Sequence, residues 1–179
     1  SICGGNRQFP AFLQDIMKDF VLPHGDVMHI HAGGNNSGAH ARELYESSVA
    51  GLAGSERAVL VDYIYDMPVQ LAAADLVICR AGAISLAELA VMGKPAILIP
   101  SPNVTDNHQY KNALVYEKAG AALLIEEKDL NPETLEKAVN SILLDPVRLR
   151  EMSENMKKLA LEDANERIWN QIKSIVKGK

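Results

Sequence analysis

The sequence is poor in cysteine, the residue that cross-links small extracellular proteins and binds structural metals. Only two cysteines, Cys3 and Cys79, occur among 179 residues, and they stand far apart and in no Cys-x-x-Cys arrangement. Neither a disulfide framework nor a zinc site is therefore expected. The composition fits a reducing, cytoplasmic compartment.

Long apolar runs and clustered basic residues are also missing. No apolar run approaches the about 18 residues that a membrane-spanning helix needs, and the beginning lacks the basic-then-apolar order of a signal peptide. The 18 Lys and Arg residues are scattered, and the net charge is -5. A broad nucleic-acid surface is not expected, because neutralising phosphates requires clustered cations. A local anion pocket remains compatible with this charge, in a soluble or at most peripheral protein.

Apolar residues are plentiful, at 47% of the chain, which is enough for residues 1–179 to form one domain with a full core. Short apolar runs without alternation indicate parallel strands covered on both faces. They are 27–31, 58–61, 76–79, 96–99 and 121–125. Helical stretches lie between and after them, near 8–20, 39–53, 67–74, 84–92, 107–119, 132–144, 146–161 and 163–176. This order predicts an α/β fold with a doubly wound, mostly parallel sheet and extra C-terminal helices.

The first residues, SICGGN, are typical of a strand that ends in a Gly-rich turn. We expect a short strand at an edge of the sheet, either cut short or beginning outside this chain.

A possible anion site follows the predicted strand 76–79, where helix amides point beyond the carboxyl ends of parallel strands. Gly82 would let the backbone approach a ligand closely, and Arg80 adds a positive charge. Glu88, one helical turn further on, could accept hydrogen bonds from both hydroxyls of a ribose. The amides that could bind a phosphate or diphosphate belong to Ala83, Ile84 and Ser85.

A purely structural interpretation of this stretch stays open. Ser85 and Glu88 match the S-x-x-E capping box, and Arg80 could be a solvated loop charge. The common nucleotide signatures do not decide the question, because the chain has no GxGxxG and the lysine in GKP is not followed by Ser or Thr.

A second polar cluster, PSPNVTDNHQYKN, spans 100–112. Thr105 or Asp106 could cap the helix that follows, placing His108 and Gln109 in its first turn, at the same end of the sheet as 80–88. Such neutral donors and acceptors suit a sugar, although an ordinary capped helix start would look the same.

Two further motifs have competing interpretations. Ile64, in VDYIYDMP, could offer backbone groups to a flat base or simply belong to a helix-entry loop. His29 and His31 alternate on a predicted buried strand with no carboxylate or cysteine nearby, so we expect core or loop histidines rather than metal ligands.

The stretches CRAGAISLAELAVMGKPAILIPSP, DNHQYKNA and EKAGAALLI resemble the carboxy-terminal domain of the MurG family, the peptidoglycan GlcNAc transferases of GT-B fold in glycosyltransferase family 28. The resemblance implies binding of UDP-GlcNAc as a substrate, without a cofactor. The implied contacts are Ile64 to the uracil, Arg80, Ile84 and Ser85 to the diphosphate, Glu88 to the ribose, and His108 and Gln109 to the GlcNAc. Further candidates are Asn6, where the family has serine, and Asp106 and Asn107.

The family carries GlcNAc to the lipid-linked acceptor lipid I, giving lipid II for cell wall biogenesis, cell shape and division. The resemblance implies that an amino-terminal domain, which this chain is expected to lack, supplies the general base, the acceptor site and the contact with the inner face of the bacterial membrane. His108 stands where the family often has glutamine, and because both side chains can donate, the resemblance implies the same role for it. No Asp-x-Asp pair occurs, so a helix terminus rather than a chelated metal is expected to stabilise the leaving diphosphate.

Three other classes share these features. One is a free-standing donor-binding subunit that works with a separate membrane-anchored acceptor subunit. Another is a UDP-GlcNAc 2-epimerase-like domain, and the third is a nucleotide sensor without catalytic activity.

Overall fold

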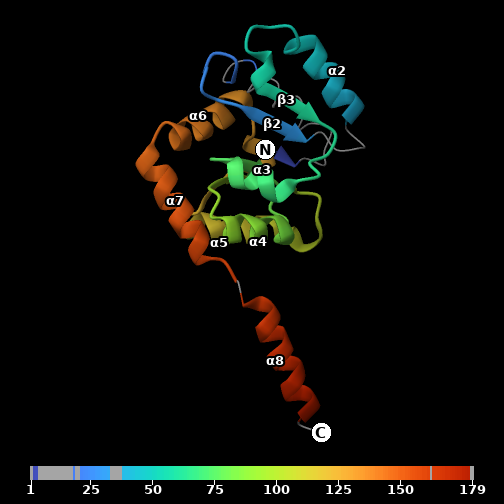
Figure 1. Ribbon diagram of the computed structural model, residues 1–179, viewed down its shortest axis with the longest axis vertical. Coiled ribbons are helices and arrows are strands. Elements are labelled where there is room, and N and C mark those ends of the chain that lie inside the picture. Colours follow the sequence, from blue (N-terminus) through green and yellow to red (C-terminus); the bar gives the residue numbers. More distant parts are fainter. Residues whose placement is uncertain (1, 4–17, 19–20, 33–37, 162, 178–179) are drawn as a thin grey trace.

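A six-stranded parallel sheet forms the centre of the protein, as shown by a computed structural model that describes residues 2–3, 18, 21–32, 38–161 and 163–177 (Figure 1). The strand order is β3-β2-β1-β4-β5-β6, and every neighbouring pair is parallel. This is the order of a doubly wound nucleotide-binding sheet, so the predicted fold class is confirmed. The strands are β1 (Ile2–Cys3), β2 (His29–Ala32), β3 (Ala58–Val61), β4 (Val77–Cys79), β5 (Ala96–Leu98) and β6 (Ala122–Leu124).

The first strand is short, as predicted, but its predicted place at the edge of the sheet is wrong. Ile2 pairs with His31 of β2 on one side and with Ile78 of β4 on the other, so β1 lies in the middle. The sequence of a single strand does not reveal its neighbours, because strand order depends on the crossover connections between strands.

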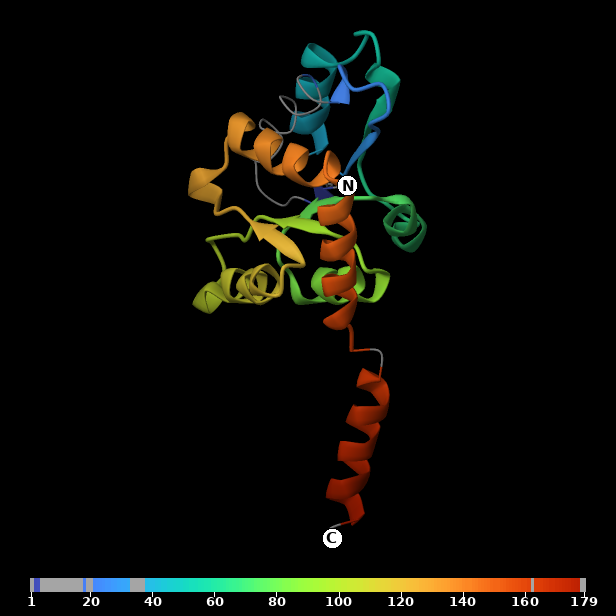
Figure 2. The same ribbon diagram turned by 90° about the vertical axis from the view of Figure 1, so that its left-hand side faces the viewer.

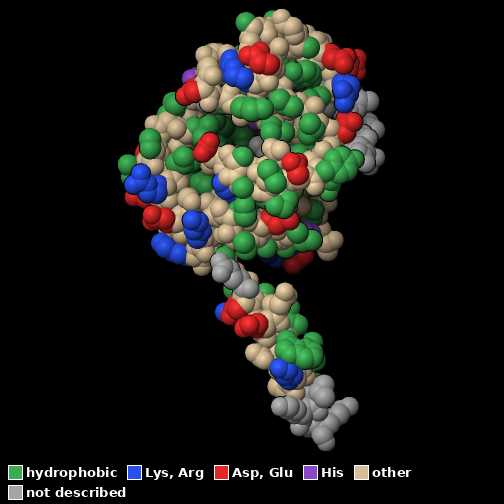
Figure 3. Space-filling view, viewed as in Figure 1, with side chains coloured by type: hydrophobic (Ala, Val, Ile, Leu, Met, Phe, Trp, Pro, Cys, Tyr) green, Lys and Arg blue, Asp and Glu red, His purple; other side chains and the backbone are tan. Residues whose placement is uncertain are grey.

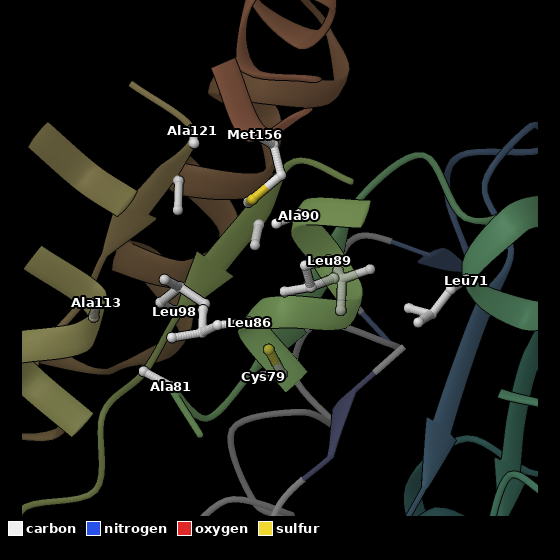
Figure 4. Packing of buried hydrophobic residues seen from close by; sticks show 13 residues of the cluster. Leu71, Cys79, Ala81, Leu86, Leu89, Ala90, Leu98, Ala113, Ala121 and Met156 are labelled. Carbon is white, nitrogen blue, oxygen red and sulfur yellow. The ribbon is translucent and has the colours of Figure 1, made fainter. Parts of the chain in front are cut away.

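Alternate residues of the central strands pack on opposite faces of the sheet. Ile78 and Ile97 belong to a core cluster with the apolar residues of α6, whereas Cys79 and Leu98 belong to a second cluster with α4 and α5. Figure 4 shows this second cluster around Leu86 and neighbouring residues. The sheet is therefore buried on both faces, which explains why its strands appear in the sequence as continuous apolar runs.

Seven α-helices are found in the described residues, each close to a predicted helical stretch. The helix predicted near 8–20 lies almost entirely outside the described residues. The α-helices are α2 (Gly38–Ser48), α3 (Met67–Ala73), α4 (Ala83–Met92), α5 (His108–Lys118), α6 (Pro132–Leu143), α7 (Pro146–Lys158) and α8 (Ala164–Lys177). Short 3-10 turns are η2 (Ser55–Arg57), η3 (Thr105–Asn107) and η4 (Glu127–Asp129).

Side-chain caps begin both α6 and α7. The Asn131 side chain accepts from the Thr134 amide, and the Thr134 hydroxyl accepts from the Asn131 amide, so α6 starts with a capping box. The Asp145 carboxylate accepts from the amides of Val147 and Arg148 at the start of α7. Both cap-then-proline starts predicted from the sequence are confirmed.

The last helix, α8, extends away from the rest of the protein in both ribbon views (Figures 1 and 2). Several of its apolar side chains are exposed, and the Lys173 ammonium lies 5.1 Å from the centre of the Trp169 ring. Among the helices that the structure describes, none combines the length and hydropathy needed to cross a bilayer. The exposed apolar residues of α8 are Ile168, Trp169, Ile172 and Ile175.

The two histidines of β2 are core residues, as predicted. His29 and His31 are buried, and their rings stack at a centroid distance of 6.2 Å. Burial lowers the pKa of His31 to about 4 and lowers the pKa of His29 well below its ordinary value. Both rings are therefore neutral at physiological pH.

Candidate functional site

The best-placed candidate site lies where the strand order reverses, between β1 and β4. In open parallel sheets the crevice beyond the carboxyl ends of the strands at this point is the usual ligand site. The turn after β1, which includes the candidate Asn6, lies outside the described residues. The turn after β4 leads through Arg80 and Gly82 into α4, so the residues that were predicted to bind an anion lie at the switch point.

The start of α4 is open rather than capped by a side chain. Gly82 is the N-cap residue and makes no side-chain cap, and Ser85 is already the third residue of the helix. The capping-box interpretation of Ser85 and Glu88 is therefore wrong. The first intrahelical bond runs from the Leu86 amide to the Gly82 carbonyl, at 3.0 Å, so the three preceding amides point out of the helix end as potential donors to an anion.

The surface around this helix end is accessible. The Ile84 side chain is 79% exposed and Glu88 is exposed. A methyl group added to Gly82 would meet only the Ser85 hydroxyl, 3.9 Å away, and Gly82 has an ordinary φ of -70°. Neither packing nor backbone conformation thus requires glycine here.

Arg80 is neither a solvated loop charge nor a freely extended cation. Its guanidinium forms an ion pair with the Glu127 carboxylate at 2.6 Å and donates to the Ile99 carbonyl at 3.2 Å. The two charged side chains are only 12% and 15% exposed, so the pair ties together the carboxyl ends of β4, β5 and β6. Sequence reasoning missed Glu127, which begins η4 three residues after the end of β6.

The loop between β5 and α5 has a local structure that the sequence did not predict. Asp106 and Asn107 both adopt left-handed conformations, with φ of 57° and 50°. Neither Thr105 nor Asp106 caps α5, contrary to expectation, because the N-cap residue is Asn107 and it makes no side-chain cap. The Asp106 carboxylate instead pairs with the Lys111 ammonium at 2.9 Å.

Internal hydrogen bonds orient the polar residues at the start of α5. His108 Nδ1 lies 2.9 Å from the Thr105 carbonyl oxygen, and Gln109 Oε1 accepts from the Ser101 amide at 2.9 Å. Asn112 Nδ2 donates to the Ala81 carbonyl at 3.3 Å. This last bond joins α5 to the turn before α4, so the structure brings the two predicted polar clusters together.

A hollow of about 430 Å³ lies between the β5–α5 loop and η4. Within it, the Lys128 ammonium binds Glu126 at 3.2 Å, and this hydrogen bond raises the pKa of Lys128. The hollow has both neutral and charged groups in its lining. It is lined by Pro100, Ser101, Pro102, Asn107, Tyr110, Glu126, Glu127 and Lys128.

Ile64 follows β3 and lies at the carboxyl end of the sheet, the same end as the start of α4. However, β3 is the outermost strand of the sheet, whereas α4 starts near its middle. The residue as a whole is buried, at 5% exposure, so neither its side chain nor its backbone presents much surface to a ligand. The flanking Tyr63 and Tyr65 are exposed, and their rings pack edge to face with centroids 5.0 Å apart.

Charges of both signs are interspersed over the face seen in Figure 3. Within the described part of the chain, no three His, Cys, Asp or Glu residues are grouped so as to hold a metal ion.

Comparison with known proteins gives matches along most of the chain. The model of the glycosyltransferase family 28 C-terminal domain matches residues 1–168. A UDP-N-acetylglucosamine--N-acetylmuramyl-(pentapeptide) pyrophosphoryl-undecaprenol N-acetylglucosamine transferase of Acetivibrio thermocellus is 48% identical over 120 residues, which are 67% of this chain and 32% of the relative. A protein of the same name from Lactobacillus johnsonii is 46% identical over 134 residues, 75% of this chain and 36% of the relative. The chain thus spans about a third of the length of these relatives.

Solved structures show the same fold. The crystal structure of Acinetobacter baumannii MurG aligns with a TM-score of 0.79 and 27% identity, covering 97% of this chain and 48% of that one. A UDP-N-acetylglucosamine 2-epimerase from Listeria monocytogenes aligns with a TM-score of 0.75 at 18% identity, covering 99% of this chain and 45% of that one. At this lower identity the likeness shows a shared fold only.

Proposed function

The chain belongs to the glycosyltransferase family 28 C-terminal domains, and from this premise we propose that residues 1–179 form a single unit that binds UDP-GlcNAc as the donor of a GlcNAc transfer. The observation that carries the proposal is the open start of α4 at the switch point of the sheet, with exposed Glu88 one turn further on. Amides followed by a carboxylate match the order of diphosphate and ribose in a nucleotide sugar.

The same arrangement supports a mechanism for the donor half of the reaction. As the bond between GlcNAc and UDP breaks, negative charge grows on the diphosphate. The amides of Ala83, Ile84 and Ser85 would stabilise this charge more in the transition state than in the ground state. The proposed role of Arg80 is to hold the turn before these amides, because its charge is already balanced by Glu127.

For the acceptor, the proposal rests on the relatives' names, which specify N-acetylmuramyl-(pentapeptide) pyrophosphoryl-undecaprenol. We propose that the complete enzyme makes lipid II from lipid I in peptidoglycan synthesis, as a cytoplasmic protein at the inner membrane face. The alignments with the curated relatives cover only 32% and 36% of their lengths. We therefore expect the 179-residue chain to bind the donor without transferring GlcNAc to lipid I.

Calorimetric titration of the chain with UDP-GlcNAc, UDP-glucose, UDP and uridine tests the donor site. UDP should bind more tightly than uridine, because the amides of α4 bind the diphosphate, and UDP-GlcNAc should bind more tightly than UDP-glucose. Equal binding of UDP and uridine would contradict the proposal.

A matched pair of glycine variants makes this test specific. Gly82→Ala would add a methyl group at the start of α4, 3.9 Å from the Ser85 hydroxyl, and if the diphosphate binds there it should weaken UDP binding while leaving uridine binding and folding unchanged. Gly25→Ala is the control, because a methyl group there meets nothing within 4 Å. Gly25 lies in the loop before β2, at the amino end of the strands and so at the opposite end of the sheet from the start of α4. Conversion of UDP-GlcNAc to UDP-ManNAc by the chain would instead favour the epimerase class.

A further inference from the structure

The two cysteines of the chain lie opposite each other on neighbouring strands, although they are far apart in the sequence. In the register of β1 and β4, the Cα partner of Cys3 is Cys79, and that of Ile2 is Ile78. Paired positions of neighbouring strands lie on the same face of a sheet, because the pleats of the strands are in phase. Cys79 is buried in the core cluster that includes the apolar residues of α4 (Figure 4). Position 3 therefore lies on this face of the sheet too.

The spacing of the two strands suits a disulfide bond. Neighbouring strands lie about 4.8 Å apart, and the Cα atoms of disulfide-bonded cysteines are usually about 4.4 to 6.8 Å apart. The Cβ atoms of such a pair are closer together, at about 3.5 to 4.5 Å. A bond between Cys3 and Cys79 therefore requires the carboxyl ends of β1 and β4 to move slightly toward each other.

The turn after β4 is held from the opposite side. In the sheet, β5 lies on the side of β4 away from β1. The Cys79 carbonyl accepts from the Ile99 amide at 2.9 Å, and the Arg80 guanidinium donates to the Ile99 carbonyl at 3.2 Å. The Ala81 carbonyl accepts from Asn112 Nδ2 at 3.3 Å. A bond that pulled Cys79 toward β1 would act against these contacts and displace the turn that leads into α4.

We propose that Cys3 and Cys79 form a redox modification site, at which oxidation to a disulfide weakens diphosphate binding at the start of α4. The effect on binding rests on the proposed function, whereas the formation of the bond does not. In a reducing compartment the pair stays reduced, so the modification occurs only when an oxidant accumulates.

The oxidant we propose is a low-molecular-weight disulfide such as glutathione disulfide. The thiolate of one cysteine attacks the small disulfide and releases one glutathione thiol, and the thiolate of the other cysteine then displaces the second. One S–S bond breaks and one forms. The two cysteine sulfurs lose two electrons to the glutathione sulfurs, and the two thiol protons pass to the released glutathione.

The bond can be tested without any nucleotide. The reduced chain is unfolded in urea and refolded in a buffer of reduced and oxidised glutathione, so that burial of Cys79 does not limit its access to the oxidant. The product should be monomeric, lighter by two hydrogen atoms and unreactive toward iodoacetamide, and its digest should contain a peptide that links Cys3 to Cys79. Dithiothreitol should restore both thiols.

The matched control moves one cysteine by a single position. The double variant Ile2→Cys with Cys3→Ile keeps two cysteines, but the moved one is paired with Ile78, on the face of the sheet opposite Cys79. It should keep both thiols in the same buffer, and circular dichroism checks that it is folded. Absence of the linked peptide from the wild-type chain, or equal cross-linking in the folded double variant, would overturn the site.

Titration calorimetry with UDP tests the effect on α4. The oxidised chain should bind UDP about threefold or more weakly than the reduced chain, because displaced amides make poorer hydrogen bonds to the diphosphate. Dithiothreitol should reverse the loss. Cys3→Val, taken through the same oxidation, should bind UDP equally under both conditions.

The two parts of the proposal fail separately. Equal binding of UDP by the oxidised and reduced chains would overturn the effect of the bond on α4. If the reduced chain does not bind UDP, the proposed function fails, and the mass and the linked peptide still decide whether Cys3 and Cys79 form a bond.

Discussion

Glu88 lies on the exposed side of α4 and makes no cap, so its side chain has no structural task that would explain a carboxylate in an otherwise apolar helix. We expect Glu88→Ala to weaken UDP binding by about 1.5 to 3 kcal/mol, the usual contribution of hydrogen bonds to a charged group. The free energy of unfolding should change by less than about 0.5 kcal/mol. Titration calorimetry and urea unfolding measure the two effects.

The control for Glu88 is Glu154→Ala, which removes an exposed carboxylate from α7. It should alter neither quantity. A Glu88→Ala protein that unfolds more easily but still binds UDP normally would show that the carboxylate is structural after all.

The buried histidines predict how stability depends on pH. The folded chain protonates His31 only near pH 4, whereas the unfolded chain does so near its ordinary pKa of 6.5. Between these values the unfolded state binds more protons, so the free energy of unfolding should fall as the pH drops from 6.5 to 4. At pH 5 the loss from His31 alone is about 2 kcal/mol. Urea unfolding at pH 7.5 and pH 5 measures it.

Replacing the titrating ring provides the comparison for this pH dependence. His31→Asn is expected to be less stable at pH 7.5, because it disturbs a buried position, but it should lose less stability between pH 7.5 and 5 than the wild type. An equal loss in both proteins would assign the acid sensitivity to other groups.

At the scale of secondary structure, the helix starts divide into capped and open ones. Asp145→Ala removes the cap of α7 and should lower the free energy of unfolding by about 1 kcal/mol, because two amides lose their acceptor. Ser85→Ala is the matched substitution at an open start, and it should cost less than about 0.5 kcal/mol, because Ser85 lies inside α4 and caps nothing. Thermal unfolding of both variants would be compared with the wild type. Equal losses would contradict the assignment of the open start.

The sequence predicted the elements well but not all of their ends. Asn131 and Asp145 were identified as caps because cap, proline and apolar spacing are local features. The start of α5 was not predicted, since Asp106 and Asn107 owe their left-handed conformations to a loop braced by contacts such as Asp106 with Lys111 and Ser101 with Gln109. The S-x-x-E pattern in α4 was misleading because a sequence motif does not fix which residue begins the helix.

At the scale of the whole molecule, α8 is set apart from the domain that carries the site (Figure 2). Removing residues 161–179 should leave UDP binding unchanged and the free energy of unfolding within about 1 kcal/mol, because nearly all described side chains of this segment are exposed. Titration with UDP and a melting curve of the shortened chain check this. A fall in the melting temperature of more than about 5 °C would show that α8 supports the core.

Relations between distant segments could not be derived from the sequence. The apolar runs predicted a parallel sheet covered on both faces, but they contained no information on strand order, and so β1 was placed at an edge. For the same reason Glu127 was missed. Its partner Arg80 is 47 residues away in the sequence, and only the neighbouring positions of β4, β5 and β6 bring the two charges together.

The central position of β1 also bears on how the chain acquires its structure during synthesis. Of the six strands of this sheet, β1 is synthesised first, and it pairs on one side with β4, about 75 residues later. Until β4 has been translated, that side of β1 has unpaired backbone groups and could associate with other nascent chains. Because β1 and β4 are far apart in the sequence, their pairing is expected to be slow and to occur late in folding. A chaperone would have its greatest effect at this step.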